Sequence, residues 1–80
     1  MEDRYTIRGM LEEKKEDLQA LLTRMDNCVK DVLYHLKLND RAYLQQIDPV
    51  AAHIARLQVM DKERCSITGQ IKELEQKLKN

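Results

Sequence analysis

Apolar side chains recur in the first half of the chain at alternating steps of four and three residues. The series consists of Leu18, Leu22, Met25, Val29, Val32 and Leu36. A heptad repeat of this kind, with a period of about 3.5 residues, is typical of helices that pack side chains into the gaps of a neighbouring helix. Leu21, Cys28 and Leu33 widen the stripe on its flanks, which favours a bundle over a two-stranded dimer. The pattern predicts a helix over about residues 10–37.

The turns before Leu18 are rich in charged residues. One heptad before Leu22 the series reaches Lys15, which lies within the run Glu-Glu-Lys-Lys-Glu-Asp over 12–17. A charged side chain is costly to bury without a partner. We therefore expect these turns to extend beyond the packed region.

A connection should follow the first helix, because the Leu-Asn-Asp sequence over 38–40 favours a helix end and a new cap. We expect a connection and a short helix over 38–48. Asp48 and Pro49 then predict a helix start with a break or kink, since proline suits the first helical turn and disfavours helical backbone just before it. The second long helix is expected over about 49–78.

The second helix has an apolar series of its own. Its members are Val50, Ile54, Leu57, Met60, Ile67, Ile71, Leu74 and Leu78. Two consecutive three-residue steps from Ile54 to Met60 predict a local overwinding of the supercoil. Arg64 occupies the position between Met60 and Ile67. Gly69 costs the helix about 1 kcal/mol relative to alanine, and marks either a tolerated defect or a close approach of another backbone.

These elements predict an all-α fold, an antiparallel and coiled-coil-like helical hairpin that forms one domain over 1–80. Short connections join antiparallel helix neighbours, and each arm should be about 40–50 Å long at 1.5 Å per residue. Two packed helices share a single contact line. Each apolar stripe is wider than one line can bury, so the remainder should form an exposed adhesive patch.

Composition and charge exclude several function classes. Fourteen basic residues balance 14 acidic ones, which argues against the basic stripe of a nucleic-acid-binding protein and against a basic membrane-surface helix. No apolar run approaches the roughly 20 residues that span a bilayer, and no apolar signal region follows the charged start of the sequence. We expect a cytoplasmic protein with no nucleic-acid partner and no membrane insertion.

Groups that could support catalysis or hold a metal are few and scattered. His35 and His53 are the only histidines, and Cys28 and Cys65 the only cysteines. His35 is expected near the end of the first helix, where a cation suits the helix dipole. A zinc site needs three or four ligands at characteristic spacings, and a nucleophile needs a base beside it in a pocket. We therefore expect no catalytic residue, no metal, no cofactor and no enzymatic activity, with the cysteines reduced and a disulfide as the alternative.

Three short segments resemble small helical export chaperones of flagellar and type III secretion systems. They are LQALL over 18–22, LQQI over 44–47 and AHIARL over 52–57, followed by Arg64. FlgN-like flagellar chaperones and YscE-like needle-subunit co-chaperones share this outline of two long helices. The resemblance covers about residues 18–67, and it implies that the protein covers an amphipathic helix of a secretion substrate or fellow chaperone until export.

We therefore expect a non-catalytic helix-binding protein, a secretion chaperone or co-chaperone with a protein partner. The alternative is a structural coiled-coil subunit that forms homo-oligomers or scaffolds a larger complex. Tyr34 and Tyr43 flank the connection, where they either bury their rings or anchor a partner. Because helix faces recognise partners through anchors three and four residues apart, the candidate partner-binding residues are Leu18, Leu22, Met25, Val29, Val32, Leu36, Tyr43, Ile54, Leu57, Met60, Ile67 and Ile71.

Overall fold

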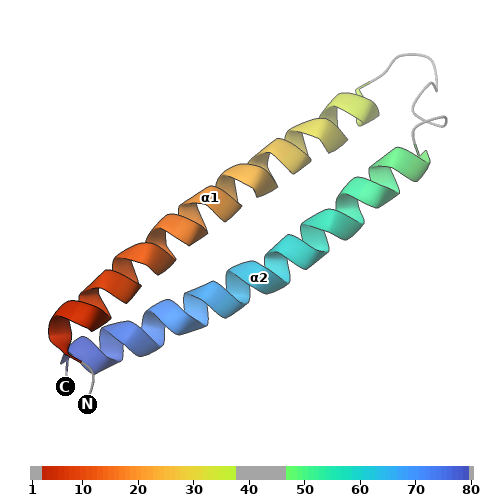
Figure 1. Cartoon of the computed structure of the whole chain (residues 1–80). Coiled ribbons are helices and arrows are strands. Elements are labelled where there is room, and N and C mark those ends of the chain that lie inside the picture. Colours follow the sequence, from red (N-terminus) through yellow and green to blue (C-terminus); the bar gives the residue numbers. More distant parts are fainter. Residues whose placement is uncertain (1–2, 38–46, 80) are drawn as a thin grey trace.

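The chain folds into two long helices that lie side by side and run antiparallel (Figure 1). The computed structural model describes residues 3–37 and 47–79, in which α1 spans Arg4–Leu36 and α2 spans Ile47–Lys79. Each helix has 33 residues, and the hairpin measures 61 × 15 × 14 Å. The start of α1 and the end of α2 lie together at one end (Figure 1). The predicted all-α helical hairpin is confirmed.

The first helix begins at Arg4, ahead of the start near residue 10 that the apolar series predicts. Asp3 caps it: a carboxylate oxygen of Asp3 accepts a hydrogen bond from the Tyr5 N–H at 3.2 Å. The carbonyl oxygen of Asp3 accepts from the Ile7 N–H at 3.0 Å. An N-cap side chain satisfies backbone donors that have no partner within the helix. Asp3 therefore fixes a helix start that the apolar pattern does not show.

Apart from Leu22, the partly or fully buried residues of α1 follow one regular line, which we call the packing line of α1. It consists of Ile7, Leu11, Lys14, Leu18, Leu21, Met25, Cys28, Val32 and His35. Leu21 and Cys28 lie on this line and not on its flanks, so the predicted register is wrong at these positions. Val29 and Leu36 are exposed beside the line. The heptad register that includes Ile7 and Leu11 passes through Leu21 and Cys28, and it buries two further turns of apolar side chains.

The N-terminal turns of α1 pack against α2, contrary to the expectation that they extend beyond it. Ile7 and Leu11 are buried there. Lys14 takes the position on the packing line and is half-buried, whereas Lys15 is exposed. A lysine can lay its aliphatic stem along an apolar surface while its ammonium group stays in water. The charged run therefore does not prevent packing.

The packing line of α2 is equally regular. It consists of Val50, His53, Leu57, Met60, Arg64, Ile67, Ile71, Leu74 and Leu78. The line passes through His53, while Ile54 is exposed beside it. The spacing along this line therefore alternates between three and four residues throughout. The predicted pair of consecutive three-residue steps from Ile54 to Met60 is wrong. Arg64 holds the predicted position between Met60 and Ile67.

The second helix begins at Ile47, so Pro49 lies in its first turn. Proline is tolerated there because its missing N–H would have no helical partner. The carboxylate of Asp48, in the same turn, suits the positive end of the helix dipole. The helix runs without interruption through Asp48 and Pro49, so the predicted break at this position, with a helix start at about residue 49, is wrong. The rest of the predicted connection and short helix, including Tyr43, lies outside the described residues.

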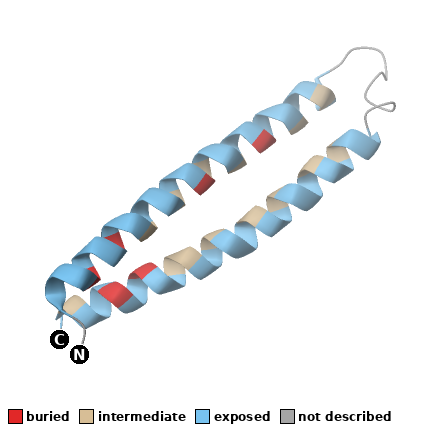
Figure 2. Cartoon of the chain, in the orientation of Figure 1, coloured by how far each residue is buried: buried red, intermediate tan, exposed pale blue. Residues whose placement is uncertain are grey.

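The buried core is concentrated toward the end of the hairpin where the termini lie (Figure 2). One cluster there consists of Ile7, Leu11, Ile71 and Leu74, with Leu18, Ile67 and Leu78 packed against it. Full burial of such a side chain contributes about 1.5–3 kcal/mol. Nearer the connection, the buried residues within the described chain are Leu21 and Cys28. The two helices thus cover each other well at one end and incompletely toward the other.

Candidate helix-docking groove

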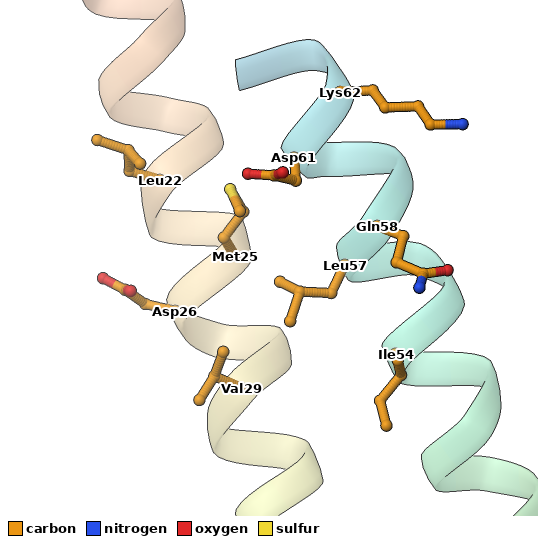
Figure 3. A pocket seen from close by; sticks show the side chains of 9 residues that line it. All are labelled: Leu22, Met25, Asp26, Val29, Ile54, Leu57, Gln58, Asp61 and Lys62. Carbon is orange, nitrogen blue, oxygen red and sulfur yellow. The ribbon is translucent and has the colours of Figure 1, made fainter. Parts of the chain in front are cut away.

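Apolar side chains displaced from the two packing lines form an open groove between α1 and α2. Leu22 and Val29 of α1 and Ile54 of α2 stand beside the line residues Met25 and Leu57. The groove has a volume of about 720 Å³, and its polar lining residues are Asp26, Gln58, Asp61 and Lys62 (Figure 3). We call this the apolar groove.

The side chains of the apolar groove remain accessible to another molecule. Leu57 points toward α1 across the space between the helices, and Lys62 points away from α1 (Figure 3). Val29 is 39% exposed and Ile54 is 44% exposed. Covering apolar area yields about 25 cal/mol per Å². The groove therefore offers a hydrophobic driving force that the isolated hairpin does not use.

The apolar groove is confined to the half of the hairpin nearer the connection. On α1, Leu36 lies one heptad after Val29 and is also exposed, so the apolar face continues in that direction. One heptad before Leu22 the equivalent position is Lys15. On α2, the position one heptad after Ile54 is Asp61. Charged residues thus limit the groove on the side of the termini.

The opposite side of the hairpin combines charged residues with a smaller hollow of about 440 Å³, whose apolar lining consists of Ala55, Val59 and Met60. Arg24 Nη2 and Glu63 Oε2 lie 3.5 Å apart across the two helices, with both side chains more than half exposed. An exposed pair of this kind contributes about 0–1 kcal/mol. A hollow on this side is lined by residues that include Asp31 and Arg56. The two sides of the hairpin therefore differ in character, and the larger apolar opening lies on one of them.

Asp61 links the groove to the packing line of α2. The Arg64 Nε–H donates a hydrogen bond to Asp61 Oδ1 at 2.8 Å. This hydrogen bond and the negative charge of Asp61 raise the pKa of the Arg64 guanidinium above its usual value. The guanidinium stays charged, so this contact holds a negative and a positive group together at the edge of the groove.

Both histidines lie at the helix interface. The rings of His35 and His53 have centroids 5.6 Å apart, and Tyr34 contacts the His35 ring edge-on at the same distance. His35 is thus part of the packing line in addition to its expected place in the last turn of α1. Tyr34 is 69% exposed, so its ring is not buried at this end of the hairpin. The Cys28 thiol donates to the His53 carbonyl oxygen at 3.1 Å.

The described chain brings no larger set of ligating groups together. Within residues 3–37 and 47–79, no three His, Cys, Asp or Glu side chains are placed to hold a metal ion. Cys28 is buried and Cys65 exposed, and both thiols are free. Outside the packing interface, the structural feature with the clearest capacity for recognition is the apolar groove.

The predicted partner-binding residues that lie within the described chain, which leaves out Tyr43, fall into three structural groups. Those that line the apolar groove are Leu22, Met25, Val29, Ile54 and Leu57. Leu18, Ile67 and Ile71 belong to the hairpin core. Val32 and Met60 are half-buried on the packing lines, and Leu36 is exposed near the connection.

Sequence reasoning missed the polar members of the groove. The residues concerned carry no apolar signal and become neighbours only when the helices are placed side by side: they are Asp26, Gln58, Asp61 and Lys62. Leu33, exposed on α1 four residues after Val29, was assigned to the stripe but not to the candidate site. A helical projection in the register of the packing lines would have placed these residues on one side.

Neither of the described helices contains an apolar stretch long enough to cross a bilayer. The comparisons with known proteins add no relative: no protein family, curated protein or solved structure matches this chain.

Proposed function

We propose that this protein is a non-catalytic helix-binding protein that accepts an amphipathic helix of a protein partner in the apolar groove. The observation that carries the proposal is the apolar lining of the groove, in which exposed Val29 and Ile54 lie beside half-buried Leu22, Met25 and Leu57. Amphipathic helices bind such surfaces through anchors spaced three, four and seven residues apart.

The shape of the groove suits a helix better than a small ligand. Its lining residues extend over two heptad-spaced positions of α1, from Leu22 to Val29, and over a matching stretch of α2, from Ile54 to Lys62. A helix laid between two others packs at about 8–10 Å from each axis. Asp26 and Lys62 provide charges of opposite sign near such a helix, and these charges would favour one orientation of the partner.

The finer form of the proposal is a cytoplasmic secretion chaperone or co-chaperone that shields the helix of an export substrate. The resemblance to flagellar and type III secretion chaperones supports it, because its segments 18–22 and 52–57 supply Leu22, Ile54 and Leu57 to the groove. An amphipathic helix held apart from its final assembly exposes apolar surface, which promotes aggregation. A groove of this kind would cover that surface until export.

A second candidate is a structural coiled-coil subunit of a larger assembly. The regular packing lines of α1 and α2 favour it, because both keep the alternation of three and four residues that coiled coils require. A subunit of that type would use the same apolar groove against other helices of the assembly. The two candidates therefore differ in the partner and not in the surface.

Site-specific photo-crosslinking tests the proposal. A photoreactive amino acid replaces Val29 in the groove, and the control variant carries it at the neighbouring exposed Lys30. Both variants are expressed in cells that naturally encode the protein, and adducts are identified by mass spectrometry. We expect position 29, and not position 30, to crosslink to an amphipathic helix of a different protein. Equal adducts at both positions, no adducts, or adducts only with the chain itself would overturn the proposal.

A further inference from the structure

The hairpin exposes more surface than a chain of its mass usually does. Its accessible surface is 6409 Å² for 9.5 kDa. A folded monomer of this mass typically exposes about 5,000 Å². The excess exceeds the roughly 800 Å² per partner that a standard protein interface buries. One further interface of ordinary size is therefore enough to bring the chain close to the usual ratio of surface to mass.

The core of the single hairpin is also small. Among the described residues, the buried apolar side chains are Ile7, Leu11, Leu21, Cys28, Ile71 and Leu74. Proteins of about this length commonly add a disulfide, a metal or another chain to supplement such a core. The two cysteines are free, and the described residues place no cluster that could hold a metal. Of the usual additions to a small hydrophobic core, this leaves a second protein chain.

We propose that a second copy of this chain covers the apolar groove, so that two hairpins pack face to face as a four-helix bundle. The inference rests on the proposed function in that it uses the same helix-docking groove, and it names the occupant in the resting protein. Val29 and Ile54 of each copy then lie against the groove of the other. A partner helix from another protein would have to displace this second copy.

The charges at the groove select one arrangement of the two copies. Asp26 of α1 and Lys62 of α2 line the same groove from opposite helices. When the two-fold axis runs parallel to the helices, α1 of one copy faces α2 of the other. Asp26 of each copy then lies at the level of Gln58 of its partner, about one helical turn from Lys62 (Figure 3), and the symmetry forms this proximity of opposite charges twice.

The alternative arrangement is electrostatically unfavourable. When the two-fold axis runs across the helices, α1 faces α1. Asp26 lies midway between Leu22 and Val29 in the lining of α1, so an axis through the centre of the groove brings the two Asp26 side chains together. Facing like charges disfavour an interface. We therefore expect a dimer in which both connections lie at the same end.

Analytical ultracentrifugation of the full chain over a range of concentrations tests the dimer. We expect a species of twice the 9.5 kDa chain mass. Val29→Asp should raise the dimer Kd by at least about tenfold, because each dimer would bury two new charges in apolar surroundings. Val59→Asp is the matched control, because Val59 is 58% exposed and does not line the groove. Circular dichroism verifies that both variants remain helical, and Ile54→Asp repeats the test if Val29→Asp fails to fold.

Charge reversal tests the arrangement. Asp26→Lys and Lys62→Asp should each raise the dimer Kd by about threefold, because like charges then lie near each other twice in each dimer, and the double variant should restore the Kd. A chain that is monomeric at all concentrations, a Val29→Asp effect no larger than that of Val59→Asp, or a double variant without rescue would overturn the inference. A monomer that still crosslinks a foreign helix at position 29 contradicts the dimer alone. A dimer without foreign adducts contradicts the proposed function alone.

Discussion

The imidazole rings of His35 and His53 stack across the helix interface, with centroids 5.6 Å apart and planes inclined by 22°. The stack lies near the end of the hairpin that the connection joins, away from the main cluster of buried side chains. Nδ1 of His35 is buried there without a hydrogen-bond partner among the described residues. This end of the hairpin is therefore less completely packed than the end with the termini.

His35→Leu should raise the free energy of unfolding by about 1 kcal/mol. A buried polar atom without a partner costs about 1–3 kcal/mol, and leucine fills a similar volume without that atom. Urea denaturation followed by circular dichroism measures the change. His35→Ala is the control, since it removes the polar atom but also the packing. A leucine variant that is no more stable than the alanine variant would show that the orphan nitrogen is not the dominant cost.

Leu21 and Leu22 form a matched pair that tests the packing register. Leu21 is 2% exposed, and Leu22 is half-buried in the groove. Leu21→Ala should cost about 2–5 kcal/mol of stability, because it leaves a cavity in the packed interface. Leu22→Ala should cost roughly 1 kcal/mol or less at concentrations where the chain is monomeric. If Leu22→Ala lowered the stability more than Leu21→Ala in thermal or urea unfolding, Leu22 and not Leu21 would lie in the packed interface.

Gly69→Ala should stabilise the hairpin by about 1 kcal/mol, because alanine is the better helix former. An added Cβ at Gly69 would meet nothing within 4 Å, so the substitution creates no clash within the chain. This open space also favours the interpretation of Gly69 as a tolerated defect. The melting temperature should rise by about 4–8 °C. A lower melting temperature would instead indicate that another backbone approaches this position, as in an assembly.

Asp3→Ala should destabilise the start of α1 by about 0.5–2 kcal/mol, since Asp3 caps the helix through the Tyr5 N–H. Asp3→Ser keeps an acceptor oxygen and should retain most of this stability. Amide hydrogen exchange across the first turn of α1 is the measurement. Equal exchange rates in the alanine and serine variants would exclude the cap as the cause.

The sequence predicted the two helices because heptad spacing directly reflects helix packing, and their antiparallel pairing because the connection between them is short. It placed the register one position away at Leu21 and Cys28, since both neighbouring lines carry apolar residues between 18 and 36. Ile7 and Leu11 continue the line through Leu21 and Cys28, and their burial selects that line for packing. Whether they are buried depends on how far α2 extends opposite them. A local pattern contains no such information.

The candidate site was predicted only in part for the same reason. Leu22, Val29 and Ile54 were identified as apolar anchors, but they were assigned to the seam and not to a groove beside it. Their exposure follows from the register, because residues one position from the packing line are left half-covered in a two-helix fold. Asp26 and Lys62 become members of one site only through the pairing of α1 with α2.

Methyl NMR with a soluble paramagnetic agent tests most directly whether the apolar groove is a docking surface. In dilute hairpin, the methyl groups of Val29 and Ile54 should be relaxed by the agent nearly as strongly as those of Val59, while Leu21 is protected. When a second copy or a partner helix fills the groove, Val29 and Ile54 should become protected and Val59 should not change. Groove methyls that are as protected as Leu21 in the dilute chain, or that stay as accessible as Val59 under every condition, would contradict a docking groove.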